Sequence, residues 1–203
     1  MDPVVKDILE VSIDEFAAHG LAGARVDAIA ARTATSKRMI YYHFENKEKL
    51  YAAALGFAYE RIRRGAALQS LDPLPPMEAL RQWTTNVFNT HAAQPAFVRL
   101  VAGENLLGAR FLSEIPDLRH FSRLDIQILE KLIARGQAEG CMRKDVRALD
   151  VYANAVGLAF HFVSNRASFA FQFEAELDPH ETLERRRASI VETIERQVMI
   201  LPR

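Results

Sequence analysis

Disulfide bonds cannot form within this chain, because Cys141 is the only cysteine among its 203 residues. A single cysteine fits a reducing compartment. The first residues mix both signs of charge and lack the apolar core of a signal peptide. No apolar run reaches the roughly 18 residues that a membrane-spanning helix needs. We therefore expect a cytoplasmic protein with no membrane partner.

The chain also has no net charge, since 26 basic residues balance 26 acidic ones. Bulk basicity, the simplest sign of a nucleic-acid-binding protein, is therefore not available, and any DNA-binding surface must come from local charge placement. Hydrophobic residues make up 49% of the chain, which is enough for a sizeable core in one or two domains.

Apolar residues recur at helical spacing along the chain, and no stretch alternates convincingly as a β-strand does. We therefore predict an all-α protein. Asp2 and Pro3 are expected to begin the first helix and Gly20 to end it. Three prolines within residues 70–76 mark a connection. Later helices are expected over 116–139, from Ala148 to about Phe171, and from an Asp178-Pro179 start signal to about Ile200.

Residues 26–50 carry the pattern with the most specific chemistry. Val26–Arg32 and a following helix that Ser36 can cap are separated by a short break, with the first helix of the chain in front of them. These are the proportions of a helix-turn-helix unit, whose last helix enters the major groove and meets base edges with its N-terminal half. We expect Ile40 and Phe44 to face inward and the polar side chains to face DNA.

The side chains of this predicted recognition helix suit DNA. Lys37 and Arg38 stand at its N-terminus, where either can donate to guanine, and the Arg38 guanidinium can do so with two hydrogen bonds. Lys47 and Arg25 are placed to hold the flanking phosphates. The full set of predicted DNA contacts is Arg25, Thr35, Ser36, Lys37, Arg38, Met39, Tyr41, Tyr42, His43 and Lys47. The acidic neighbours Asp7, Asp14, Glu15 and Asp27 are expected to lie on other faces.

The stretch from Val26 to Leu50 resembles the DNA-binding domain of the tetracycline-repressor (TetR) family of bacterial regulators. The matching residues are Ile29-Ala30, Ser36, Tyr41-Tyr42-His43-Phe44, Lys47-Glu48 and Leu50. The resemblance covers about the first quarter of the chain, and the remainder matches in length and helical character. We accordingly predict a three-helix helix-turn-helix DNA-binding domain over residues 1–47 and a larger helical effector-binding and dimerisation domain over residues 48–203.

The sequence departs from the family pattern in three places. At one of them Arg38 replaces a frequent glycine, which adds a base-reading side chain. Ala24 and Arg25 stand where the family usually has a threonine to cap the second helix, so the cap must be weaker or supplied differently. Ala34 replaces the usual glycine of the turn. If that turn required a positive φ, alanine there would be strained by about 1 kcal/mol.

The resemblance also implies a small-molecule effector that binds the second domain and releases a repressor from its DNA. The last two long helices, about 148–171 and 179–200, are too apolar to face water and are the predicted homodimer surface. Two recognition helices would then meet half-sites about 34–36 Å apart on near-palindromic double-stranded DNA. Polar and aromatic side chains on apolar faces are the effector-site candidates: Trp83, Asn86, Phe88, Phe111, His161, Phe162 and Asn165. An activator, or a repressor without a ligand, stays open.

Two other classes of protein are weaker alternatives. A helical-bundle enzyme would need paired carboxylate–histidine motifs on facing helices, and Asp117 with His120 supplies one such spacing without a second copy. The sequence has no metal-ligand spacing, P-loop or dinucleotide fingerprint, so we predict no enzyme activity, no metal and no cofactor. A ligand-free helical interaction module would leave the basic and aromatic cluster at 37–43 unexplained.

Overall fold

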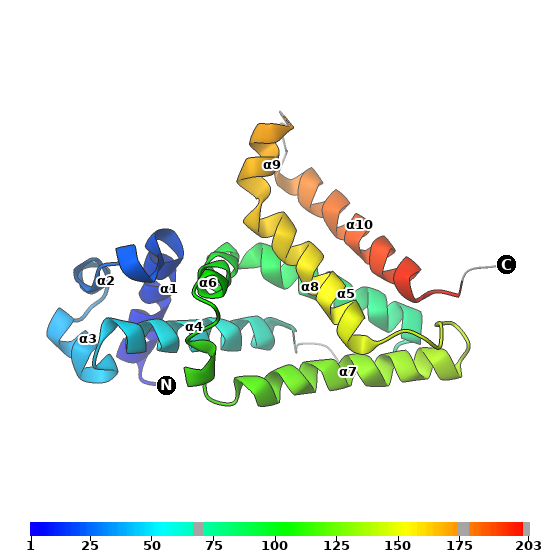
Figure 1. Cartoon of the computed structure of the whole chain (residues 1–203), viewed down its shortest axis with the longest axis horizontal. Helices are drawn as coiled ribbons and strands as arrows, with labels where there is room; N and C mark the ends of the chain where they lie inside the picture. The colour runs from blue at the N-terminus through cyan, green and yellow to red at the C-terminus, as the bar shows by residue number, and fades with distance from the viewer. Residues whose placement is uncertain (67–70, 174–178, 201–203) are drawn as a thin grey trace. The chain divides into compact units, whose positions relative to one another are not determined.

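A computed structural model describes residues 1–66, 71–173 and 179–200, and in these ranges the chain is built from α-helices (Figure 1). Other regular structure in the same ranges is limited to a short 3-10 turn and an isolated β-bridge between Met142 and Met199. None of the described helices is both long and apolar enough to cross a membrane. The predicted all-α fold is confirmed.

The chain divides into two compact units. The first combines Met1–Arg63 with Gln94–Leu118, and the second combines Arg64–Ala93 with Arg119–Arg203. The first unit contains α1 (Pro3–Gly23), α2 (Val26–Arg32), α3 (Lys37–Phe44), most of α4 (Lys47–Ala66), α6 (Pro95–Leu106) and the 3-10 turn η1 (Leu112–Glu114). The second contains α5 (Pro76–Ala93), α7 (Leu118–Ala138), α8 (Ala148–Ser164), α9 (Arg166–Gln172) and α10 (Pro179–Val198). The unit around the predicted DNA-binding helices is thus larger than residues 1–47.

Helix α1 begins as its sequence predicts, and Gly20, its expected end, interrupts the helix, which continues to Gly23. Asp2 Oδ1 accepts the Val4 N–H at 2.8 Å, and Pro3 occupies the first turn, where its missing N–H costs nothing. Gly20 leaves the helical conformation with φ 66° and ψ 173°, which glycine tolerates, and its carbonyl accepts the Ala24 N–H at 3.1 Å. The apolar stripe of α1 is buried, and the helix packs against α2 and α6.

The α6–η1 segment is held on α4 inside the first unit. The ring of the buried Tyr51 makes edge contacts with Phe16 at 5.1 Å and with Phe111 at 5.2 Å between centroids. Glu104 is only 1% exposed, and its Oε1 accepts the Phe111 N–H at 2.6 Å. Burial, and then the neighbouring Glu104, raise the pKa of Tyr51, so its hydroxyl remains protonated. Lys49 adds an ion pair to Glu114 at 3.2 Å.

In the second unit α5 packs against α8 and α10, and α8 packs against α10. Its core is an apolar cluster formed by Ala79, Leu80, Phe88, Leu129, Leu132, Ile133, Met142, Ala148, Val151, Ala155, Ala159, Ile190, Ile194 and Val198. The connection after α7 folds back closely, because a Cβ on Gly136 would lie 2.5 Å from Met142 Sδ. The Arg143 N–H donates to the Val198 carbonyl at 2.9 Å and fixes this connection to the end of α10.

The single helix expected from Ala148 to about Phe171 is broken at Asn165, which has φ −104° and ψ 7°. The Asn165 side-chain amide donates to the His161 carbonyl at 3.1 Å, a local bond that competes with helix propagation. The helix expected from residue 116 begins at Leu118, because Asp117 adopts a positive φ of 57°. Helix α10 begins at Pro179 as predicted, and its predicted cap Asp178 lies outside the described residues.

The outer faces of α8 and α10 differ from the apolar surfaces that the sequence analysis expected. The exposed residues of α8 are Leu149, Asp150, Ala153, Asn154, Gly157, His161 and Ser164. Those of α10 in its described part are Glu181, Glu184, Arg185, Ala188, Ser189, Glu192, Thr193 and Arg196. The expectation that α10 is too apolar to face water is therefore wrong: its apolar side chains point into the second unit, and charged and small residues remain outside.

Candidate nucleic-acid interface

Helix α3 is anchored by its caps and by one buried side chain. Ser36 Oγ accepts the Met39 N–H at 3.3 Å, which satisfies a donor of the first turn as predicted. Asn46 Oδ1 does the same for the Lys49 N–H at 2.8 Å at the start of α4. Ile40 is fully buried, whereas Phe44 is half-buried. The helix is therefore fixed on α2 by its inner side, which leaves its outer side to solvent.

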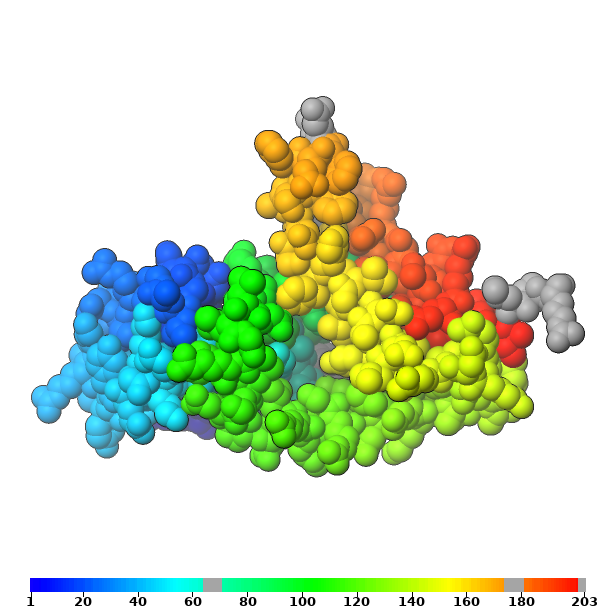
Figure 2. Space-filling view, viewed as in Figure 1, coloured from blue at the N-terminus to red at the C-terminus, as the bar shows by residue number. Residues whose placement is uncertain are grey.

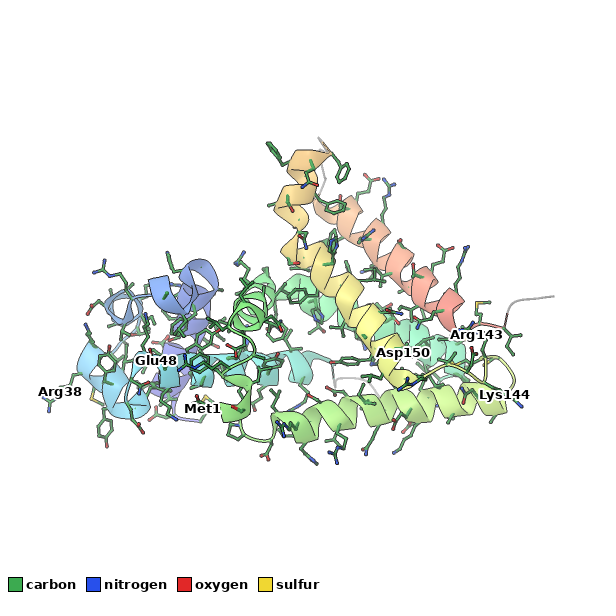
Figure 3. The ribbon with its side chains drawn as sticks, viewed as in Figure 1. Met1, Arg38, Glu48, Arg143, Lys144 and Asp150 are labelled. Carbon is green, nitrogen blue, oxygen red and sulfur yellow. The ribbon has the colours of Figure 1, made fainter. Side chains whose placement is uncertain are left out.

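The outer side of α3 presents large side chains to solvent. Arg38, Met39, Tyr41 and Tyr42 are exposed, with Tyr42 at 76%. The segment protrudes from the surface of the first unit in the space-filling view (Figure 2), and Arg38 points away from the helix (Figure 3). Arg38 makes neither a hydrogen bond nor an ion pair with another described residue. Its guanidinium is therefore available to an external acceptor.

Lys37, by contrast, is already paired. Its Nζ lies 2.9 Å from Oδ2 of Asp27 on α2, and this hydrogen bond raises the pKa of Lys37. Both side chains are largely exposed, so the pair can exchange with solvent ions. The expectation that Asp27 lies on another face is wrong. A phosphate that approaches Lys37 meets the Asp27 carboxylate as well.

The remaining three acidic neighbours contact α2 and the residues beside it. All three come from α1 and bind groups at the two ends of α2. The contacts join Glu15 Oε1 to the Arg25 N–H at 3.1 Å, Asp14 Oδ2 to Arg32 Nη2 at 3.1 Å, and Asp7 Oδ2 to the Ala34 N–H at 3.3 Å. They hold α2 on its supporting helix. Since Arg25 supplies no side-chain cap, the Glu15 carboxylate is the acceptor that serves the start of α2.

Between α1 and α4 the strained backbone position is Glu45, not Ala34. Ala34 does not have a positive φ, and the preceding Thr33 is extended with φ −116° and ψ 159°. Glu45 has φ 63° and ψ −54°, and the following Asn46 N–H reaches the Phe44 carbonyl at 2.6 Å. These values describe a γ-turn of the rare, strained hand. The break between α2 and α3 is therefore relaxed, and the joint between α3 and α4 is the strained one.

Lys47 has structural partners. Its half-buried side chain donates from Nζ to the carbonyls of Ala22 at 3.2 Å and Ala24 at 3.1 Å. The ammonium thereby holds the connection between α1 and α2 against the start of α4. The Lys47 ammonium has three protons, and the two carbonyls accept two of them, so one proton is left for a phosphate. The predicted contact of Lys47 with phosphate therefore remains a prediction.

The other predicted contacts surround this face. Thr35 is half-buried in the break, and Ser36 is exposed while it caps α3. The half-buried His43 ring meets Tyr42 edge-on, with centroids 5.4 Å apart. The Arg25 side chain is exposed at the start of α2. The structure therefore gathers the predicted residues around α3 and its two flanking joints.

The predicted effector residues fall in separate places. Trp83 and Phe162 line the core of the second unit half-buried, and Phe88 is buried in it. The Trp83 ring lies 6.2 Å from Tyr152, and the Phe88 ring lies 5.6 Å from Phe162, between centroids. Phe111 belongs instead to the first unit, where it is buried.

The polar effector candidates have local partners. The half-buried Asn86 accepts a hydrogen bond from Gln82 Nε2 at 2.9 Å. His161 stands on the exposed face of α8 with its ring 5.7 Å from Phe169. Asn165, described above, occupies the break between α8 and α9. These contacts are local to α5, α8 and α9.

Two polar residues on the inner face of α5, Thr84 and His91, are buried. Thr84 Oγ1 is buried and has no hydrogen-bond partner among the described residues. His91 is buried with Nδ1 2.7 Å from the Val87 carbonyl, and burial lowers the pKa of His91. Their helical spacing from Phe88 was the signal that placed both on the inner face.

Comparisons with known proteins agree with this arrangement over nearly the whole chain. The family "Bacterial regulatory proteins, tetR family" matches residues 8–54, and "Tetracyclin repressor-like, C-terminal domain" matches residues 76–194. The chain is 31% identical over 160 residues to the HTH-type transcriptional repressor NicS of Pseudomonas putida, which covers 79% of this chain and 76% of that protein. It is 30% identical over 154 residues to the HTH-type transcriptional repressor SCO4008 of Streptomyces coelicolor, covering 75% and 74% of the two chains.

Solved structures resemble the fold as well. The transcriptional regulator SCO4942 of Streptomyces coelicolor superposes with a TM-score of 0.73 at 27% identity, covering 96% of this chain and 98% of that one. A regulatory protein from Rhodococcus superposes over the full length of both chains with a TM-score of 0.75, and at 18% identity it bears on the fold alone. The exposed α3, its capped helix-turn-helix and the two family matches lead to one assignment: the chain belongs to the TetR family of bacterial transcriptional regulators.

Proposed function

We propose that this regulator is a cytoplasmic repressor that binds a near-palindromic operator as a homodimer and leaves it when a small molecule binds the second unit. The observation that carries the proposal is the outer side of α3, where Arg38 is exposed and unpaired among the described residues. A surface arginine at the start of a helix that protrudes from its unit is suited to donate two hydrogen bonds to guanine.

The residues around Arg38 take complementary roles in this proposal. Met39 and Tyr41 offer apolar edges to thymine methyl groups, and both are exposed on α3. The backbone N–H groups at the start of α3 favour a phosphate. Arg25 and Lys37 hold phosphates on either side, and Lys37 does so after it leaves Asp27.

The test is a gel shift with full-length protein on DNA from upstream of its own gene. We expect Arg38→Ala to weaken specific binding by about 1–3 kcal/mol, roughly ten- to a hundredfold, and to relax the preference for one base. Arg99→Ala, which removes an exposed arginine from α6 of the same unit, is the matched control and should bind as the parent does. A folded, dimeric Arg38→Ala protein that binds its operator as tightly as the parent would overturn the assignment of α3.

The proposed dimer uses the outer faces of α8 and α10. These helices pack side by side within the second unit (Figure 1). Ala153 and Gly157 on α8, with Ala188 and Ser189 on α10, are small exposed residues that let helices of another copy approach closely. Pairing α8 and α10 with their copies would form a four-helix bundle.

The proposed effector acts in the second unit, beside the aromatic residues of α5. Trp83 is the only tryptophan of the chain and packs near Tyr152, so its fluorescence reports this region directly. Titration with small molecules should change Trp83 emission and release operator DNA over the same concentration range. Couplings of about 1–3 kcal/mol would lower operator affinity about 5- to 150-fold. A compound that releases DNA without altering the Trp83 signal would place the effector elsewhere.

A further inference from the structure

The exposed side of α10 carries charged residues in pairs. The two members of each pair lie at equal distances from the middle of the helix face and have opposite charge. Along one stripe the chain presents Glu181, Arg185, Ala188, Ser189, Glu192 and Arg196. With 3.6 residues per turn, these six positions fall within about 100° of the helix circumference. The charge order is therefore minus, plus, two small residues, minus, plus on a single face.

This order is self-complementary about the midpoint between Ala188 and Ser189. Residues equally distant from that midpoint on the two sides have opposite charge: Arg185 corresponds to Glu192, and Glu181 corresponds to Arg196. We propose that a second copy of this chain docks antiparallel on the stripe, with the two-fold axis between Ala188 and Ser189. The inference rests on the proposed homodimer and specifies which residues fix its register.

The small residues at the midpoint set the distance between the two helices. Helices in contact lie about 8–10 Å apart, and the shorter distances need small side chains at the crossing. Ala188 and Ser189 meet this need. Arg185 and Glu192 lie about 5 Å along the axis from the midpoint, and Glu181 and Arg196 lie about 11 Å from it, at 1.5 Å per residue. The inner pairs therefore stay within reach over a wide range of crossing angles.

The charged side chains are already oriented along the stripe within one copy. Arg185 Nη1 lies 3.7 Å from Glu181, and Arg196 Nη2 lies 2.6 Å from Glu192. All four side chains are at least 61% exposed, so neither pair is shielded from a partner. In the antiparallel dimer each pair would join the opposite pair of the second copy to form a cluster of alternating charge.

Other registers are disfavoured by the same charges. A slip of one helical turn in one direction sets Arg185 against Arg196 of the second copy, and a slip in the other direction sets Glu181 against Glu192. Like charges across an interface are unfavourable, so both slips lose the attraction and add repulsion. The stripe thus selects one alignment of the two α10 helices.

The experiment exchanges charges between two full-length variants. Arg185→Glu alone would face Glu192 twice in its homodimer, and Glu192→Arg alone would face Arg185 twice. We expect each homodimer to dissociate about tenfold more readily than the parent at low ionic strength. When the two variants are mixed, both pairs regain opposite charges. The heterodimer should therefore exceed the one-half share that random exchange gives, as measured by native mass spectrometry with one subunit mass-tagged.

A control keeps the outcomes distinct. Lys131→Glu and Glu130→Arg exchange exposed charges on α7, away from the stripe, and their mixture should give one-half heterodimer. A second pair of variants, Arg196→Glu and Glu181→Arg, repeats the test at the outer positions of the stripe. A parent protein that is monomeric would overturn the proposed dimer. A dimeric parent with random mixing of both α10 variant pairs would overturn this register and leave the dimer standing.

Discussion

Lys47 is the residue whose role the structure changes most, and Lys47→Met separates the two possibilities. A phosphate contact would make Lys47 part of the DNA footprint, whereas the observed geometry makes it a clamp on the α1–α2 connection. Methionine retains the length and much of the apolar stem but cannot donate. The substitution therefore removes the hydrogen bonds and leaves most of the packing.

The size of the effect follows from the two carbonyls that lose their donor. Ala22 is exposed, so water can replace Lys47 there at little cost. Ala24 is only 3% exposed, and a buried acceptor left without a partner costs about 1–3 kcal/mol. We expect Lys47→Met to lower the free energy of unfolding by about 1–2 kcal/mol. For a chain of this length that corresponds to a fall in Tm of roughly 3–6 °C.

The assay pairs thermal unfolding with operator binding at several salt concentrations, and compares Lys47→Met with Lys37→Met. Removing a lysine that contacts phosphate reduces the slope of log affinity against log salt by about 1. We expect Lys37→Met to reduce the slope with no loss of Tm, since Lys37 and its partner Asp27 are exposed. Lys47→Met should lower Tm and leave the slope close to that of the parent.

The reverse result would refute this reasoning. If Lys47→Met unfolds at the parent's temperature and loses about one unit of salt slope, the carbonyl contacts contribute no stability and the ammonium serves phosphate. Lys6→Met removes an exposed lysine that pairs with Glu10 on α1 and should change neither quantity.

Two further predictions concern the neighbours of α3. Asp27→Asn should tighten operator binding, because it releases Lys37 and removes a carboxylate near the phosphate. The expected gain is up to about fivefold, the size of one exposed charge interaction. A gain that stays unchanged at high salt would contradict an electrostatic cause. Glu45→Gly should raise the free energy of unfolding by up to about 1 kcal/mol, since relief of a φ of 63° exceeds the entropic cost of glycine. Glu45→Gln keeps the strained backbone and loses the charge, so in chemical denaturation it should match the parent.

The helices and their caps were predictable because their signals are local. Asp2, Ser36 and Asn46 each accept an N–H two or three residues ahead, so the capping residue and the helix it serves lie together in the sequence. Ile40 was placed inside by its spacing along one short helix. The break at Asn165 was missed because asparagine is tolerated within helices, and only its bond to the His161 carbonyl shows that the helix ends there.

The polar contacts between helices were not predictable, since their partners lie far apart in the sequence. Lys47 donates to carbonyls 23 and 25 residues earlier, and Asp27 and Lys37 are 10 residues apart on different helices. The sequence shows that these side chains are charged, but the partner that each one contacts depends on how the helices pack. The inclusion of Gln94–Leu118 in the first unit has the same origin, because the bond between Glu104 and Phe111 matters only once Tyr51 of α4 packs beside them.

The pairing of charges around α3 bears on how a chain without net charge could select its operator. Lys47 is committed to carbonyls and Lys37 is shared with Asp27, which leaves Arg38 as the unpaired cation on the outer side of α3 within the described residues. On the proposed interface, phosphate replaces Asp27 as the partner of Lys37, an exchange of one anion for another that adds little to binding at any sequence. Arg38 makes no such exchange, and its full hydrogen-bonding capacity is met only by a base with two acceptors, such as guanine. An interface with few unpaired cations therefore has a low affinity for non-specific DNA. A larger share of its binding free energy at the operator comes from base-specific contacts.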